Sequence, residues 1–202
     1  MKKCIELALE LYSNNEFDRI IDFRNKIQDF AEGKWLLGES YIYSNLNRNL
    51  ENAIKLLTDS CNMNCPQSCL SLANLFDPRI EYANKKIDSL RDLDEKRCKE
   101  YYKKVFEVSN DLASEGDGDA MRILAQLYLT GDGCEKNYEQ ALFWYKSSFK
   151  SGVISSANEL ILFYSDENSL FYDIELAKYY FSACEDKSVL NIDPNIIKLL
   201  GE

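Results

Sequence analysis

Histidine is absent from this chain of 202 residues, and glycine and proline are scarce. Without histidine, neither a Ser-His-Asp nor a Cys-His pair can activate a nucleophile, and no imidazole can bind a metal. With only 8 glycines and 3 prolines, the sequence favours long helices over many short strands. These absences predict a helical protein without histidine-dependent catalysis. No pair of carboxylates stands out as a general acid and base, so we expect no enzymatic activity. We expect the protein to use no cofactor and no metal.

Positive charge is also in short supply: 24 Lys and Arg stand against 34 Asp and Glu, a net charge of −10. Nucleic acids and anionic membranes are bound by clustered basic residues, so we expect neither as a partner. No apolar run approaches the length of a membrane span, and Glu6 and Glu10 interrupt what would be the core of a secretory signal. We therefore predict a cytoplasmic protein with reduced thiols. The acidic charge favours a basic partner protein and serves solubility equally well.

The sequence contains a repeat with a period of 36 residues. Residues 116–151 align with residues 152–187 without a gap. The matched pairs are Gly116 with Gly152, Leu124 with Leu160, Tyr128 with Tyr164, Ala141 with Ala177, Trp144 with Tyr180, Tyr145 with Phe181, and Ser148 with Cys184. Periods of this size are typical of stacked helical hairpins, which bury their apolar faces only against neighbouring hairpins and present an extended surface.

The same frame extends towards the N-terminus. Tyr41 and Phe76 take the place of Tyr128, and apolar residues at helical spacing over 2–13 and 17–30 predict a further hairpin before the first repeat. Asp193-Pro194 is a favourable helix start and predicts a short capping helix at the C-terminus. The expected units are an N-terminal helical hairpin over 1–32, repeats over 33–65, 66–115, 116–151 and 152–187, and a capping helix over 188–202.

The unit at 120–152 carries the most specific pattern: Leu124-Ala125, then Tyr128, the turn Gly131-Asp-Gly133, Ala141 and Trp144-Tyr145. This pattern resembles a Sel1-like repeat, a relative of the tetratricopeptide repeat with a longer turn between its two helices. The resemblance implies an all-α, right-handed αα-hairpin solenoid that acts as an adaptor and has no catalytic residues. The Gly-x-Gly turn is then a repeat turn, because it lacks the Lys-Ser/Thr of a phosphate-binding loop.

Three of the seven cysteines, Cys61, Cys65 and Cys69, are spaced by four residues. On one continuous helix they would share a face and could form a thiolate metal site. Pro66 and the repeat frame place them across a helix–turn–helix junction instead. We therefore expect them to be free thiols that fill small buried positions.

Two regions are candidates for partner binding. In an αα-solenoid the first helix of each hairpin tends to line the concave side, and its intervening positions can face a groove. These positions are Lys34, Glu39, Ser71, Asn74, Arg122, Gln126, Asn158 and Glu159. The second region is a charged insertion near 77–95, which is either a solvated segment or a specificity element. The sequence predicts a protein–protein interaction module. An acidic immunity protein that neutralises a basic toxin or enzyme is the alternative.

Overall fold

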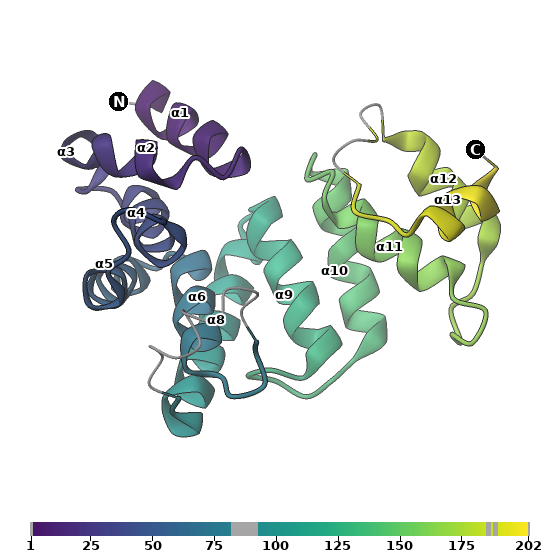
Figure 1. Cartoon of the computed structure of the whole chain (residues 1–202). Coiled ribbons are helices and arrows are strands. Elements are labelled where there is room, and N and C mark those ends of the chain that lie inside the picture. Colours follow the sequence, from purple (N-terminus) through teal and green to yellow (C-terminus); the bar gives the residue numbers. More distant parts are fainter. Residues whose placement is uncertain (1, 82–92, 185–186, 188–189, 202) are drawn as a thin grey trace. The chain divides into compact units, whose positions relative to one another are not determined.

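The computed structural model describes residues 2–81, 93–184, 187 and 190–201. Every regular element among these residues is helical, as the composition predicts. The chain divides into two compact units, residues 1–108 and 109–202 (Figure 1). Each unit is a succession of helices, most of them joined by short connections.

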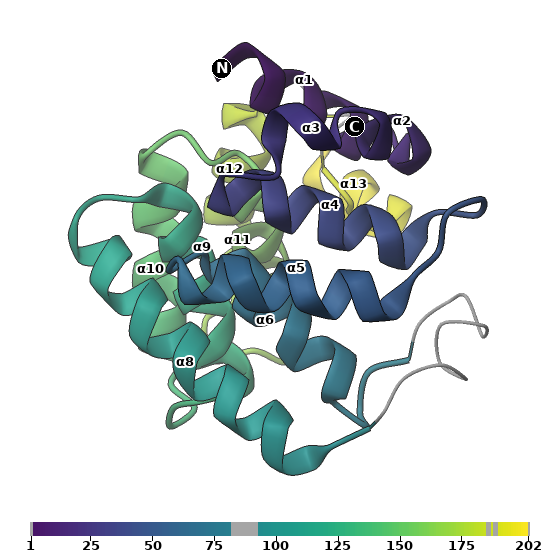
Figure 2. The same ribbon diagram turned by 90° about the vertical axis from the view of Figure 1, so that its left-hand side faces the viewer.

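The first unit contains the N-terminal helices and most of the longest one. In it, α5 packs against both α4 and α6, and the three lie one after another in Figure 2. The helices are α1 (Lys2–Ser13), α2 (Phe17–Asp22), α3 (Arg24–Ile27), α4 (Ala31–Tyr43), α5 (Leu50–Asn62), α6 (Pro66–Phe76) and α8 (Glu95–Ser114), the last of which ends within the second unit.

The single helix expected over 17–30 is instead two short helices, α2 and α3. The backbone N–H of Phe23 bonds to the carbonyl of Ile20, 2.9 Å away and only three residues back, which tightens and ends α2. Ile20 and Ile27 on either side of this break are both fully buried. The break therefore lets both helices direct their isoleucines into one core.

The second unit consists of hairpins that follow one another along the chain. Each helix contacts the next, and all of them contribute to one apolar core that includes Tyr145, Leu160, Tyr164 and Phe181. The helices are α9 (Gly118–Thr130), α10 (Tyr138–Lys150), α11 (Ser156–Ser165), α12 (Ile174–Ala183) and α13 (Pro194–Leu200).

One hydrogen bond closes the turn of each of the four repeat hairpins. The carbonyl of an aromatic residue near the end of the first helix accepts from the N–H of the residue that caps the second helix. The pairs, with their N to O distances, are Tyr41 and Asn49 (3.0 Å), Phe76 and Asp94 (3.1 Å), Tyr128 and Asn137 (2.8 Å), and Tyr164 and Asp173 (2.9 Å). The side chain of each Asn or Asp then accepts a backbone N–H of the first turn of the second helix.

The capping residues also set the position of the small buried residues. Ala53, Cys98, Ala141 and Ala177 each lie four residues after a cap, and all are at most 3% exposed. In the repeat at 33–65, Gly38 on the facing helix is equally constrained, because a Cβ atom there would lie 2.7 Å from Cγ of Leu57. The two helices of a hairpin therefore approach too closely for a larger side chain at these positions.

The second helix of the unit at 66–115 begins earlier than the sequence suggests. Its apolar pattern predicts a start around Val105, but α8 begins at Glu95, directly after its cap Asp94. The insertion thus lies inside the turn, between the residues that close it. Residues 82–92 of the insertion lie outside the described part of the chain.

A buried serine relay joins successive hairpins in both units. In the first unit, the hydroxyl of Ser60 donates to the carbonyl of Ala31 (2.6 Å) and accepts from Ser68 (2.7 Å). In the second, the hydroxyl of Ser148 donates to the carbonyl of Gly118 (2.7 Å) and lies 2.7 Å from that of Ser156. All four serines are fully buried, so each relay links three helices inside the core.

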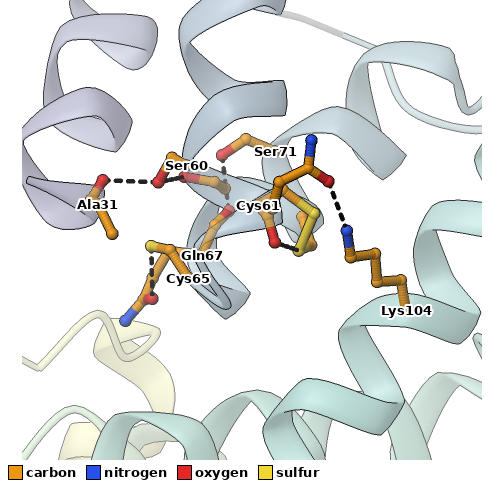
Figure 3. The surroundings of a disulfide bond; sticks show 10 residues. Ala31, Ser60, Cys61, Cys65, Gln67, Ser71 and Lys104 are labelled. Carbon is orange, nitrogen blue, oxygen red and sulfur yellow. Dashed lines mark hydrogen bonds between the residues drawn. A yellow bond between two sulfur atoms is a disulfide. The ribbon is translucent and has the colours of Figure 1, made fainter.

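Cys61 and Cys69 form a disulfide, which corrects the expectation of free thiols at these two positions (Figure 3). They directly follow Ser60 and Ser68 of the relay, one on α5 and the other on α6. The turn between the helices brings their Cα atoms to 4.9 Å, within the range that a disulfide requires. Cys65 stays a buried free thiol, as predicted. With two of the three sulfurs bonded to each other, the thiolate metal site is also ruled out in this state.

A groove on the C-terminal unit as the candidate binding site

Four of the eight predicted contact residues line one cavity of about 320 Å³ in the C-terminal unit. Arg122 and Gln126 come from α9, and Asn158 and Glu159 come from α11. These are first helices of consecutive hairpins, which is why the residues face the same space. The rest of the lining is Leu129, Thr130, Tyr145 and Ser155.

A second cavity, of about 460 Å³, shares Leu129 and Glu159 with the first. We refer to the two cavities together as the groove, to the first as its polar half and to the second as its aromatic half. The aromatic half is otherwise lined by Tyr138, Leu162, Phe163, Asp166, Asn168, Ser169, Leu170 and Phe171. The groove therefore runs from a polar end at α9 and α11 to an end at the α11–α12 turn where aromatic rings lie beside polar side chains.

Three rings form the wall of the aromatic half. The centroids of Tyr138, Phe163 and Phe171 are 6.2 to 6.4 Å apart, and each pair is tilted or edge-to-face. The ammonium of Lys136 lies 4.7 Å from the Tyr138 centroid. The rings therefore pack against one another in the geometry that aromatic pairs prefer, and one of them already attracts a cation.

The turn that carries Phe171 is held by its own hydrogen bonds. Oδ1 of Asp166 accepts the backbone N–H of Asn168 (2.9 Å), and Oγ of Ser169 accepts that of Phe171 (3.1 Å). Such local bonds from Asp and Ser side chains fix a turn without glycine. The segment that replaces Gly131-Asp-Gly133 in this repeat therefore builds one wall of the groove.

Charge in the polar half is concentrated on Glu159 and Arg122. Burial raises the pKa of the Glu159 carboxyl, and the positive charge of Arg122 partly offsets this. The Arg122 Nε lies 3.9 Å from Oδ1 of Asp119, beyond hydrogen-bond distance. This buried Nε has no hydrogen-bond partner among the residues that the structure describes. The Nε of Arg122 is thus enclosed, and the arginine contributes positive charge to the polar half of the groove.

Comparison with known proteins identifies the repeats. The sequence model of the Sel1 repeat family matches residues 31–65 and 118–153. Two segments of the chain therefore match the Sel1 repeat. A comparison with curated protein sequences gave no match.

Two solved structures share the fold. The Sel1 repeat protein from Oxalobacter formigenes is 14% identical, with a TM-score of 0.51 over 92% of this chain and 74% of that one. A protective antigen of uropathogenic Escherichia coli strains, displaying an SLR fold, is 18% identical, with a TM-score of 0.53 over 84% of this chain and 36% of that one. The predicted fold class, an αα-hairpin solenoid, is thereby confirmed. Sel1 repeats commonly serve as scaffolds for protein–protein interaction.

The other four predicted contact residues lie in the N-terminal unit and have partners there. Lys34 Nζ is 3.8 Å from Oδ2 of Asp59. Ser71 donates to the carbonyl of Gln67 (3.0 Å), and Asn74 accepts from the hydroxyl of Tyr102 (2.9 Å). None of these residues lines the groove on the C-terminal unit.

Glu39 does not lie on an open surface, contrary to expectation. It is only 7% exposed, and the hydroxyl of Tyr12 on α1 donates to its carboxylate (3.2 Å). Burial raises its pKa, and the neighbouring hydroxyls of Ser71 and Tyr12 only partly offset the effect. The N-terminal hairpin covers this position of α4, which the repeat frame could not indicate because that hairpin is not a regular repeat.

The aromatic half of the groove was not anticipated. Apart from Leu129 and Glu159, which it shares with the polar half, its residues lie at the end of α11, in the α11–α12 turn and at the start of α10. These are outside the helix positions that the frame singled out. One signal was available in the sequence. The turn at 165–168 departs from Gly-x-Gly, and the aromatics Phe163 and Phe171 flank it.

Proposed function

We propose that this protein is a non-enzymatic protein–protein interaction module that binds a segment of a partner protein in the groove of its C-terminal unit. The observation that carries the proposal is the groove itself, in which side chains of consecutive hairpins line two adjoining cavities of different character. Helical-repeat proteins use their extended concave surfaces in this way.

The lining suits a polypeptide better than a small metabolite. The polar half offers the amides of Gln126 and Asn158, which can bond to peptide groups. It also offers the positive charge of Arg122, whose side chain is 33% exposed. The aromatic half exposes apolar surface, with Leu162 40% and Leu170 fully exposed. Aromatic and arginine side chains in desolvated pockets supply most of the binding energy in protein interfaces. A partner that crosses both halves would use both kinds of contact.

The test compares capture by wild type and by a groove variant. Gln126→Arg places a long charged side chain in the polar half, so we expect it to lose the specific partner that wild type captures. Ser147→Arg is the matched control, because Ser147 is a half-buried residue of α10 that lines neither half of the groove. Capture that survives Gln126→Arg, or that is lost equally with Ser147→Arg, would refute the proposal.

A second candidate function, inhibition of a basic toxin or enzyme as an immunity protein, uses the same groove. The net charge of −10 favours it, because opposite charge accelerates association. Under this reading an equimolar amount of the protein abolishes the partner's activity. Under the adaptor reading the partner binds with its activity intact.

None of the described helices is both long and apolar enough to cross a bilayer. The cytoplasmic location predicted from the sequence stays a prediction. It was linked to reduced thiols, and the Cys61–Cys69 disulfide does not agree with that part of the argument. A thiol count on protein isolated under alkylating conditions tests whether this pair is oxidised in the cell.

A further inference from the structure

We propose that the aromatic half of the groove is a pocket for a basic side chain, an arginine or a lysine, of the partner protein. This inference rests on the proposed function, since it names the chemistry of the residue that the groove would receive.

The lining of the pocket combines aromatic rings with carboxylates. Tyr138, Phe163 and Phe171 supply three rings within 6.4 Å of one another, and Glu159 and Asp166 supply two carboxyl groups. Aromatic faces attract cations, most strongly where water is excluded. A basic side chain also has an apolar stem, which can lie along Leu129 and Leu162. Each part of a lysine or arginine therefore meets a surface of matching character.

The charge balance of the pocket favours a cation over an apolar side chain. An apolar occupant would take Glu159 and Asp166 out of water without giving them a partner, which is costly. Arg122 acts on Glu159 from the polar half, and Lys136 lies over the Tyr138 ring. Asp166 has hydrogen bonds from Asn168, and no cation pairs with it among the residues that the structure describes. Asp166 is thus the carboxylate that a partner's cation would meet.

One of the protein's own cations lies against this cluster. The Lys136 ammonium is 4.7 Å from the centroid of Tyr138, in the range of a cation–π contact. Tyr138 is one of the three rings, so the surface that we assign to a partner's cation already holds one of the protein's own at its edge.

Three small probes distinguish a cation site from an apolar pocket. They are the Nα-acetyl methylamides of arginine, lysine and norleucine, the last of which matches the lysine stem without its charge. Titrated into the ¹⁵N-labelled full chain, the arginine or lysine probe is expected to shift the amide signals of residues 163–171. Norleucine is expected to bind about tenfold more weakly or not at all. Equal binding of norleucine, or no shift from either basic probe, would overturn the inference.

Two matched variants test the role of Asp166. Asp166→Asn keeps an oxygen that can accept the Asn168 N–H but removes the charge, so we expect about tenfold weaker binding of the basic probe. Glu167→Gln removes the neighbouring exposed carboxylate, which does not line the pocket, and should leave binding unchanged. Equal affinities for the wild type and Asp166→Asn would contradict the inference, as would equal losses in the two variants.

The outcomes also separate this inference from the proposed function. If Gln126→Arg abolishes partner capture but no basic probe perturbs residues 163–171, the groove binds a partner and the aromatic half takes another kind of residue. If the basic probes bind as expected but Gln126→Arg leaves capture intact, the pocket is a cation site and the proposed use of the whole groove is wrong.

Discussion

The buried serine relay of the second unit makes an unequal prediction for two similar substitutions. Ser148 donates its only hydroxyl proton to the carbonyl of Gly118, so in the pair with Ser156 it must be the acceptor and Ser156 the donor. Ser148→Ala therefore removes two hydrogen bonds and leaves the hydroxyl of Ser156 buried without a partner. Ser156→Ala removes one bond and leaves the other intact.

The expected losses of unfolding free energy follow from this difference. A hydrogen bond contributes about 1 kcal/mol net, and a buried polar group left without a partner costs about 1–3 kcal/mol. Ser156→Ala should therefore cost about 1 kcal/mol and Ser148→Ala about 2–3 kcal/mol. The double variant should lose about 2 kcal/mol of unfolding free energy, less than the sum of the two single losses. It also removes the Ser156 hydroxyl, which Ser148→Ala alone leaves buried without a partner.

The assay must report on the second unit alone, because two units need not unfold together. The chain has two tryptophans: Trp144 packs on the core of the second unit, and Trp35 on that of the first. In a Trp35→Phe background, urea unfolding followed by fluorescence measures the unit that contains the relay. A Ser156→Ala loss equal to or larger than that of Ser148→Ala would refute the assigned direction of the bond, and additive losses would show that the hydroxyls are not coupled.

Three other outcomes follow from the described packing and charges. The raised pKa of Glu39 makes the unfolding free energy of the wild type fall as pH rises above the ordinary glutamate range. In urea titrations between pH 4.5 and 7, the stability of Glu39→Gln should therefore increase relative to that of the wild type. A constant difference between the two proteins across that range would contradict the burial effect. Ala141 is fully buried, so Ala141→Arg should unfold the second unit, which circular dichroism would detect. Arg122→Ala should change the unfolding free energy by no more than about 0.5 kcal/mol. Equal melting temperatures for the wild type and Ala141→Arg would refute the packing described for Ala141. The Cys61–Cys69 disulfide joins residues 8 apart in the sequence, so its reduction should lower the unfolding free energy by about 2.5 kcal/mol. Dithiothreitol should have no effect on the stability of the control variant Cys61→Ala/Cys69→Ala.

The sequence was sufficient for the repeat register because each hairpin uses the same few contacts. The aromatic positions aligned as Tyr41, Phe76, Tyr128 and Tyr164 are the residues whose carbonyls close the four turns. Those carbonyls must meet a capping N–H in every repeat, so the spacing around them is constrained and visible. The expected positions of Arg122, Gln126, Asn158 and Glu159 follow from this register.

What could not be predicted depends on contacts outside the register. The burial of Glu39 depends on Tyr12 of the N-terminal hairpin, whose break at Phe23 has no counterpart in the repeats. The disulfide depends on the angle at which α5 and α6 meet, which brings Cys61 and Cys69 together although they lie on different helices. The aromatic half depends on a turn whose local hydrogen bonds replace those of Gly-x-Gly.

The bond between Phe76 and Asp94 has a consequence for how this protein can change over evolution. It closes its hairpin in the same way as the bond from Asn49 to Tyr41, although residues 77–93 separate its ends where residues 42–48 suffice elsewhere. Doubling a flexible loop costs only about 0.6 kcal/mol of closure entropy. The geometry of the hairpin is thus independent of the length of chain inserted there. Sequence can therefore be inserted, removed or grafted at this turn while the flanking helices keep their register.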